Sequence, residues 1–174
     1  MKTDQATEEE SNRSSIVRLV GLAPGIHLRE VERALGISLT TVRYHVQLLS
    51  SSGLISCVTD GTYVRLYPAG TEQEEMRLYS RLRSRTARKI LATLLQSPHI
   101  TNKEISNITG LAKSTVSEHI QTFVQNNIVN VSENRWVSPK LSLANPDLIR
   151  KILNRGGSME NSGVVQRFVD LWDF

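Results

Sequence analysis

The sequence of 174 residues has only one cysteine, Cys57, and no long hydrophobic run. A single cysteine excludes an intrachain disulfide and leaves no thiolate cluster with which one chain could bind a metal. No apolar stretch approaches the roughly 18 residues of a membrane-spanning helix, and the first 15 residues are polar and acidic, unlike a secretory signal. We therefore expect a cytoplasmic protein that needs no metal or cofactor and contacts no membrane.

Catalytic patterns are also missing. The sequence shows neither a nucleophile, base and orienting group in a usable arrangement nor a glycine-rich phosphate loop, so we expect no enzyme. Its hydrophobic content of 39% and charged content of 22% are close to globular averages, which favours a folded chain. The formal net charge of +4 is compatible with a polyanionic partner, but many proteins without one share such a surplus.

The strongest signal is an internal repeat. When the sequence is shifted by 74 positions it aligns with itself without a gap, and apolar positions coincide along both copies. A duplication of this kind predicts two modules of the same fold. The identical pairs include Pro24 with Pro98, Glu30 with Glu104, Gly36 with Gly110, Thr41 with Thr115, Val42 with Val116, His45 with His119, and Gln47 with Gln121.

Each copy predicts three helices followed by a β-hairpin. The short second helix begins with the capping box Thr101-x-x-Glu104 in copy two, where His27 takes the place of the threonine in copy one. Gly36 and Gly110 are suited to the left-handed residue that closes the following tight turn. The third helices carry apolar stripes that must face a core: Val42, Val46 and Leu49, then Val116, Ile120 and Phe123.

The predicted hairpins complete the pattern. In copy one, strands at 56–60 and 62–67 flank an Asp60-Gly61 turn. In copy two, a shorter hairpin is expected from 129–133, a turn at Asn134-Arg135, and Trp136-Val137. The fold class is therefore mainly α with small β-hairpin wings (α+β), as two winged helix-turn-helix modules in tandem plus C-terminal helices.

Five segments follow from these patterns. We expect a flexible acidic tail at 1–12, module 1 at 13–70, a basic helical linker at 71–86, module 2 at 87–139 and a C-terminal helical extension at 140–174. The linker helix is expected to be continuous with the next helix or slightly broken. In the extension, Asn145-Pro146 is typical of a helix start and Gly156 of a helix end.

A family resemblance rests on Gly36 to Leu49 followed by Gly53-Leu54-Ile55, which resembles the recognition helix and first wing residues of ArsR-like and MarR-like regulators. Residues 110–129 resemble them less closely. The likeness covers about residues 14–138, and its style is similar to archaeal tandem winged-helix regulators. It implies a third helix laid in the DNA major groove and a wing on adjacent phosphates or the minor groove. Because Cys57 stands alone, the metal sensing of some ArsR proteins is not expected.

The candidate DNA contacts in copy one lie on the third helix and the wing. Arginine can form a bidentate contact with guanine and glutamine with adenine, while hydroxyl groups can bind phosphates or bases. The alternative is an ordinary solvated helix face. A histidine beside the apolar stripe can also simply donate to backbone or phosphate. The candidates are Thr40, Thr41, Arg43, Tyr44, His45, Gln47 and, on the wing, Arg65.

Copy two shows a weaker version of the same face. Glu118 replaces Tyr44 and would repel phosphates, so this module either contacts DNA less strongly or contacts protein. Its candidate DNA contacts are Lys113, Ser114, Thr115, Ser117, Gln121 and, on the wing, Arg135.

Two further segments leave alternatives open. The basic run from Arg77 to Lys89 predicts either a ridge facing phosphates or an exposed face neutralised by nearby glutamates. The apolar stripe in 164–174 predicts a helix packed on its own protein or in a homodimer, or else a docking peptide for basal transcription machinery.

Taken together, the sequence predicts a sequence-specific regulator of transcription that binds double-stranded DNA. The main alternative is a tandem winged-helix scaffold for protein interactions in a chromosome or transcription complex. Basic charge and Arg43 favour the regulator.

Overall fold

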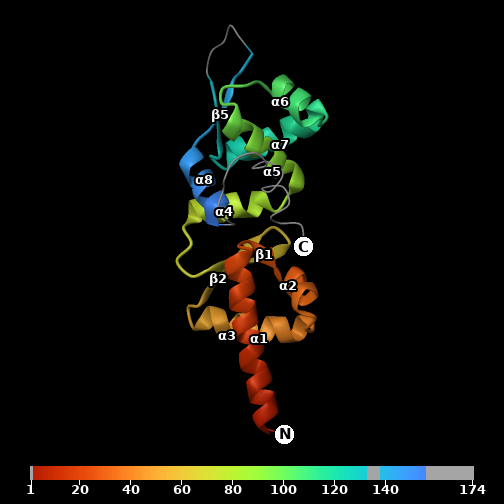
Figure 1. Cartoon of the computed structure of the whole chain (residues 1–174), viewed down its shortest axis with the longest axis vertical. Coiled ribbons are helices and arrows are strands. Elements are labelled where there is room, and N and C mark those ends of the chain that lie inside the picture. The colour runs from red at the N-terminus through yellow and green to blue at the C-terminus, as the bar shows by residue number, and fades with distance from the viewer. Residues whose placement is uncertain (1, 133–137, 156–174) are drawn as a thin grey trace. The chain divides into compact units, whose positions relative to one another are not determined.

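The order of helices and strands repeats along the chain (Figure 1). The computed structural model describes residues 2–132 and 138–155, and side chains from residue 9 to residue 152 within them. Two units divide between Ser80 and Arg81. The fold is mainly helical with small antiparallel sheets, in two winged-helix units, as the sequence predicts.

The first unit contains three helices and a three-stranded sheet. Its elements are α1 (Lys2–Leu22), β1 (Ile26–His27), α2 (Leu28–Leu35), α3 (Leu39–Ser51), β2 (Ile55–Asp60) and β3 (Tyr63–Pro68), followed by α4 (Gln73–Leu82), which crosses the division between the units. The strand order is β1-β3-β2, with all neighbours antiparallel. Asp60 pairs with Tyr63 around Gly61, which has a φ of 58°, so the predicted wing and its turn are confirmed.

The N-terminal segment differs from the prediction. A flexible tail was expected at residues 1–12, but α1 is helical from Lys2. No glycine or proline occurs before Gly21, and the segment contains alanine, glutamine and several glutamates, which favour helix. The prediction of a tail rested on the acidic composition, but the uninterrupted helix propensity of these residues outweighs it. Figure 1 shows the N-terminal half of α1 extending beyond the rest of its unit, while Ile16 and Val20 are fully buried.

The second unit repeats the arrangement. It contains α5 (Arg85–Gln96), α6 (Asn102–Thr109), α7 (Lys113–Gln125), β4 (Val129–Val131), β5 (Leu141–Leu143) and α8 (Pro146–Arg155). Helices α4 and α5 are separate, because Ser84 caps α5 by accepting a hydrogen bond from the Ala87 amide at 3.3 Å. The predicted start of α8 is confirmed, with the Asn145 side chain accepting from the Leu148 amide at 3.0 Å. Gly156 lies outside the described residues.

The second wing contains a strand later in the chain than predicted. Val129–Val131 pairs with Leu141–Leu143, and Trp136-Val137 lies outside the described residues. The Gly25 amide donates to the Leu66 carbonyl at 2.8 Å, and the His99 amide donates to the Leu141 carbonyl at 2.9 Å, so Leu141 takes the place of Leu66. Both leucines of β5 are buried. The second wing therefore extends past the predicted boundary at residue 139.

The turn between the second and third helices is built alike in both copies. Gly36 and Gly110 end the short helices in left-handed conformations, with φ of 66° and 70°, as predicted. The Thr101 capping box is present, and hydrogen bonds from the Thr101 amide and hydroxyl hold the pKa of Glu104 below its usual range. His27 forms the same box with Glu30, because its ring Nδ1 accepts the backbone hydrogen bond that a threonine hydroxyl would accept.

The third helices differ at the N-cap. The Ser38 hydroxyl accepts a hydrogen bond from the Thr41 amide at 3.1 Å, whereas Ala112 at the equivalent position supplies no side-chain cap. We predict that Ser38→Ala lowers the free energy of unfolding by about 1 kcal/mol and that Ala112→Ser raises it by up to about 1 kcal/mol. Urea titration checks both variants. A loss from both would contradict the assigned caps.

Candidate nucleic-acid interface

Helix α3 is held firmly at its first turn. Besides the Ser38 cap, the Leu39 amide donates to Glu32 Oε1 at 3.1 Å, which joins the start of α3 to the side of α2. Val42, Val46 and Leu49 are buried, as predicted. The buried stripe and the two contacts at the first turn fix the rotation of the helix, so its opposite face is presented in a defined orientation.

The opposite face of α3 is exposed. Thr40, Arg43, Tyr44 and Gln47 are all accessible, and the Tyr44 side chain is 51% exposed. Because α-helical residues advance by 100° each, these positions fall on one side of the helix. Thr41 is half-buried at the edge of this face, with its hydroxyl 2.8 Å from the Ser38 hydroxyl. The structure thus brings together five of the seven candidates in copy one.

His45 is not part of this face. It is 1% exposed, and its ring contacts that of Tyr44 edge-on with centroids 5.2 Å apart. It lies beside Val42 and Leu49 on the inward side of α3, so the core stripe is one residue wider than the apolar residues alone indicate. We therefore remove His45 from the direct DNA contacts.

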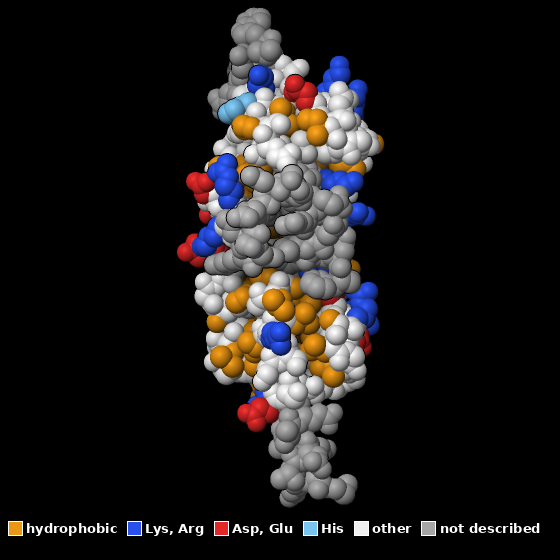
Figure 2. All heavy atoms as spheres, viewed as in Figure 1, with side chains coloured by type: hydrophobic (Ala, Val, Ile, Leu, Met, Phe, Trp, Pro, Cys, Tyr) orange, Lys and Arg blue, Asp and Glu red, His pale blue; other side chains and the backbone are white. Residues whose placement is uncertain are grey.

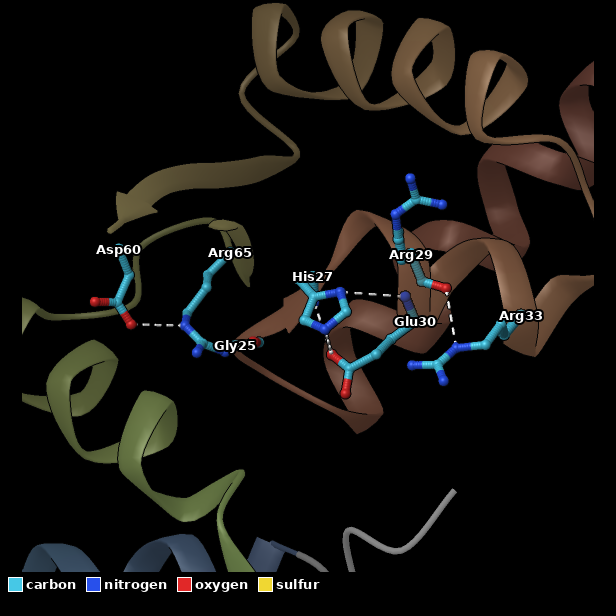
Figure 3. A network of polar contacts seen from close by, with 7 residues as sticks. All are labelled: Gly25, His27, Arg29, Glu30, Arg33, Asp60 and Arg65. Atoms are coloured by element: carbon cyan, nitrogen blue, oxygen red, sulfur yellow. Dashed lines mark hydrogen bonds and ion pairs between the residues drawn. The ribbon is translucent and has the colours of Figure 1, made fainter. Parts of the chain in front are cut away.

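Arg65 is held by hydrogen bonds within the first unit (Figure 3). Its Nε donates to Asp60 Oδ2 at 2.8 Å and its Nη1 donates to the Gly25 carbonyl at 3.0 Å, and the side chain is 14% exposed. Strand β3 lies between β2 and β1. An arginine in β3 can therefore reach both the turn of the wing and Gly25, which lies between α1 and β1. These contacts hold Arg65 within the first unit, and its predicted contact with phosphates or the minor groove stays a prediction.

We predict that Arg65→Ala lowers the free energy of unfolding by about 1.5–3 kcal/mol, the usual range for hydrogen bonds to charged groups. The salt dependence of DNA affinity is expected to stay unchanged, because no phosphate contact is lost. Urea titration and a salt titration of duplex binding measure the two quantities. Unchanged stability together with a shallower salt dependence would show that Arg65 contacts phosphate after all.

Sequence reasoning missed Arg29 on α2. Its side chain is 72% exposed, and its Nη1 lies 3.7 Å from Glu32 Oε2, the same carboxylate that binds the start of α3. Arg29 therefore lies beside the N-terminal end of α3. The signal was present in the repeat, since the shift of 74 positions pairs Arg29 with Lys103, which is also exposed. A cation recurs at this position in both modules.

Helix α7 presents the equivalent face in the second unit. Lys113, Ser114, Ser117 and Gln121 are exposed, and Thr115 is half-buried. Glu118 is exposed among them, so the face carries one cation and one anion. The remaining candidate, Arg135, lies outside the described residues.

The basic run does not form a continuous exposed ridge. Arg85 is exposed, but Arg77, Arg81 and Lys89 are half-buried. Arg88 is 1% exposed and donates to the Leu82 carbonyl at 2.9 Å, which satisfies a backbone acceptor at the end of α4. On the face drawn in Figure 2, Lys and Arg side chains stand in separate groups. The distribution of charge alone therefore does not locate an interface.

In the described part of the chain, no group of three or more His, Cys, Asp or Glu side chains is placed to hold a metal ion. No described helix combines the length and apolar character needed to cross a membrane.

A match to a known family covers part of the second unit. Residues 83–130, which contain α6 and α7, match a family model described as winged helix-turn-helix DNA-binding. The second module is thus similar to DNA-binding domains. Over 111 residues the chain is 29% identical to an uncharacterized HTH-type transcriptional regulator of Methanocaldococcus jannaschii, a match covering 63% of this chain and 28% of that protein. The chain therefore spans less than a third of the length of this relative.

Two solved structures show weak similarity. A protein of Corynebacterium diphtheriae is 14% identical with a TM-score of 0.31, over 80% of this chain and 27% of that chain. ScpB of Mycobacterium tuberculosis is 12% identical with a TM-score of 0.28, over 87% of this chain and 98% of that chain. At these TM-scores neither match bears on function.

Proposed function

We propose that the chain is a sequence-specific, double-stranded DNA-binding regulator of transcription, in which α3 reads the major groove and the β2–β3 wing follows the backbone or minor groove. The observation that carries this proposal is the exposed face of α3, where Arg43 and Gln47 stand one turn apart above a buried stripe. Both side chains can pair bidentately with base edges.

The neighbouring groups suit the same docking. In a helix-turn-helix, the N-terminal residues of the recognition helix contact bases and the preceding helix crosses the phosphate backbone. Thr40 lies in the first turn of α3, and Arg29 lies beside that turn on α2. Thr40 is thus placed for a base or phosphate and Arg29 for a phosphate. The similarity of the second module to DNA-binding domains supports DNA as the partner of the chain.

Selection of bound sequences from random duplex DNA tests the proposal directly. A regulator is expected to enrich a defined motif, and its affinity should fall steeply as salt rises because bound counterions are released. A protein-interaction scaffold would enrich no motif and bind duplex weakly at every salt concentration. That outcome would overturn the proposal.

We predict that Arg29→Ala reduces the slope of log affinity against log salt by about 0.9, the value for one lost phosphate contact, without changing the enriched motif. Affinity measured at four or more salt concentrations gives the slope. Arg18→Ala, which removes an exposed arginine from α1, serves as the control. Equal slopes for Arg29→Ala and the parent chain would exclude this contact.

A further inference from the structure

The second unit contains an open groove beside the exposed face of α7. It has a volume of about 660 Å³ and lies between the first turn of α6, the exposed side of α7 and the wing strands. Ile120 and Leu141 form a buried part of its wall. Val124 and Val131 also line it, yet remain 37% and 42% exposed. The groove thus leaves apolar surface open to solvent.

The polar lining is cationic. Lys103 and Lys113 contribute the charges, and none of the described residues that line the groove carries a carboxylate. Asn102 Nδ2 donates to the Ser117 hydroxyl at 3.4 Å, while Asn102 Oδ1 is buried without a hydrogen-bond partner. An occupant that matches this lining would carry large apolar side chains together with carboxylates.

The open shape favours a polypeptide over a small molecule. Small-molecule sites usually enclose most of the surface of their ligand, whereas these valines stay accessible. An amphipathic helix laid in an apolar groove is a common mode of peptide recognition.

We propose that the groove binds residues 164–174 of the same chain. This segment places Phe168, Leu171 and Trp172 at helical spacing and adds Asp170 and Asp173, which complement the two lysines. The described helix α8 belongs to the same unit as the groove and ends at Arg155. The eight residues 156–163 between α8 and this segment can span up to about 27 Å, close to the roughly 30 Å across a domain of this size, so the segment can reach a groove on the same unit.

Occupation of the groove has a consequence for DNA binding, and this step alone rests on the proposed function. Lys113, Ser117 and Gln121 line the groove and are also candidate DNA contacts of α7. The bound segment and a duplex therefore compete for α7, and the second module is autoinhibited.

Disulfide trapping in the full chain tests the docking. In a Cys57→Ser background, Val124→Cys is combined with Leu171→Cys. The matched control pairs Leu171→Cys with Ile108→Cys, because Ile108 is 60% exposed on α6 and does not line the groove. We expect the intramolecular disulfide to form at least ~10-fold faster in the groove pair. Equal rates would overturn the proposal, and disulfide-linked dimers alone would assign the groove to a second copy.

A charge exchange tests the recognition chemistry. Reversing Lys103 and Lys113 to glutamate is expected to slow trapping about 10-fold, and adding Asp170→Lys with Asp173→Lys should restore the rate. An unchanged rate after the first reversal would rule out the charge pairing. Because trapping is measured without DNA, failure of the docking leaves the DNA-binding proposal standing, and trapping in a chain that binds no duplex would overturn only the proposed function.

Discussion

Replacing Arg43 with alanine is expected to weaken binding to the selected duplex about 5- to 150-fold, equivalent to about 1–3 kcal/mol. The loss is expected to be specific for sequence. Arg43 is exposed on a helix whose rotation is fixed, so its guanidinium group can meet guanine O6 and N7 without rearrangement of the core. Affinities for the selected duplex and for a scrambled duplex measure the effect.

The repeat supplies the control for this prediction. Ser117 occupies the position of Arg43 in the second module, and Ser117→Ala is expected to reduce affinity less. Selection repeated with Arg43→Ala should relax the base preference at one position of the motif. An equal loss on selected and scrambled DNA would assign Arg43 to a phosphate instead of a base.

Replacing Phe123 with alanine is expected to lower the free energy of unfolding of the second unit by about 3–5 kcal/mol. Phe123 is fully buried on the inward face of α7, so truncation removes apolar contacts and leaves a cavity. Hydrogen exchange measured peptide by peptide reports on the stability of each unit separately. Protection in α5 to α7 should fall far more than protection in α1 to α3, because each unit has its own buried cluster.

The matched variant is Leu49→Ala, which truncates the equivalent residue of α3. It is expected to reverse the pattern, with a loss of about 2–5 kcal/mol confined to the first unit. If both variants lowered protection equally throughout the chain, the two units would not be separate folding units.

Local chemistry explains why much of the fold was predictable. The repeat indicates two modules because the same apolar skeleton recurs at a fixed shift, and Gly36 and Gly110 mark turns that need a left-handed residue. The stripes of α3 and α7 follow from helical spacing. Each of these signals depends on neighbours within a few residues, so the sequence contains them directly.

The surroundings of Arg65 and the pairing of the second wing depend on contacts between separate segments of the chain. In the sequence, Arg65 looks like a free cation on the wing. In the structure, β3 brings it to the Gly25 carbonyl, which is 40 residues away in the chain. The partner strand of β4 lies ten residues further along the chain, from Val131 to Leu141, and alternating apolar residues do not specify which of two later segments pairs. His45 was predicted as a candidate DNA contact because its side chain is polar. Its position beside the apolar stripe of α3 instead places it in the core.

The central claim is that the exposed face of α3 contacts a duplex groove, and photo-crosslinking from position 44 tests it most directly. A photoreactive amino acid replaces Tyr44, which is 51% exposed on that face, and a second variant carries it at Leu22, which is 67% exposed at the end of α1. We predict that position 44 crosslinks to bases within the selected motif and that position 22 does not. Bound duplex without a crosslink from position 44, or equal crosslinking from both positions, would contradict the account.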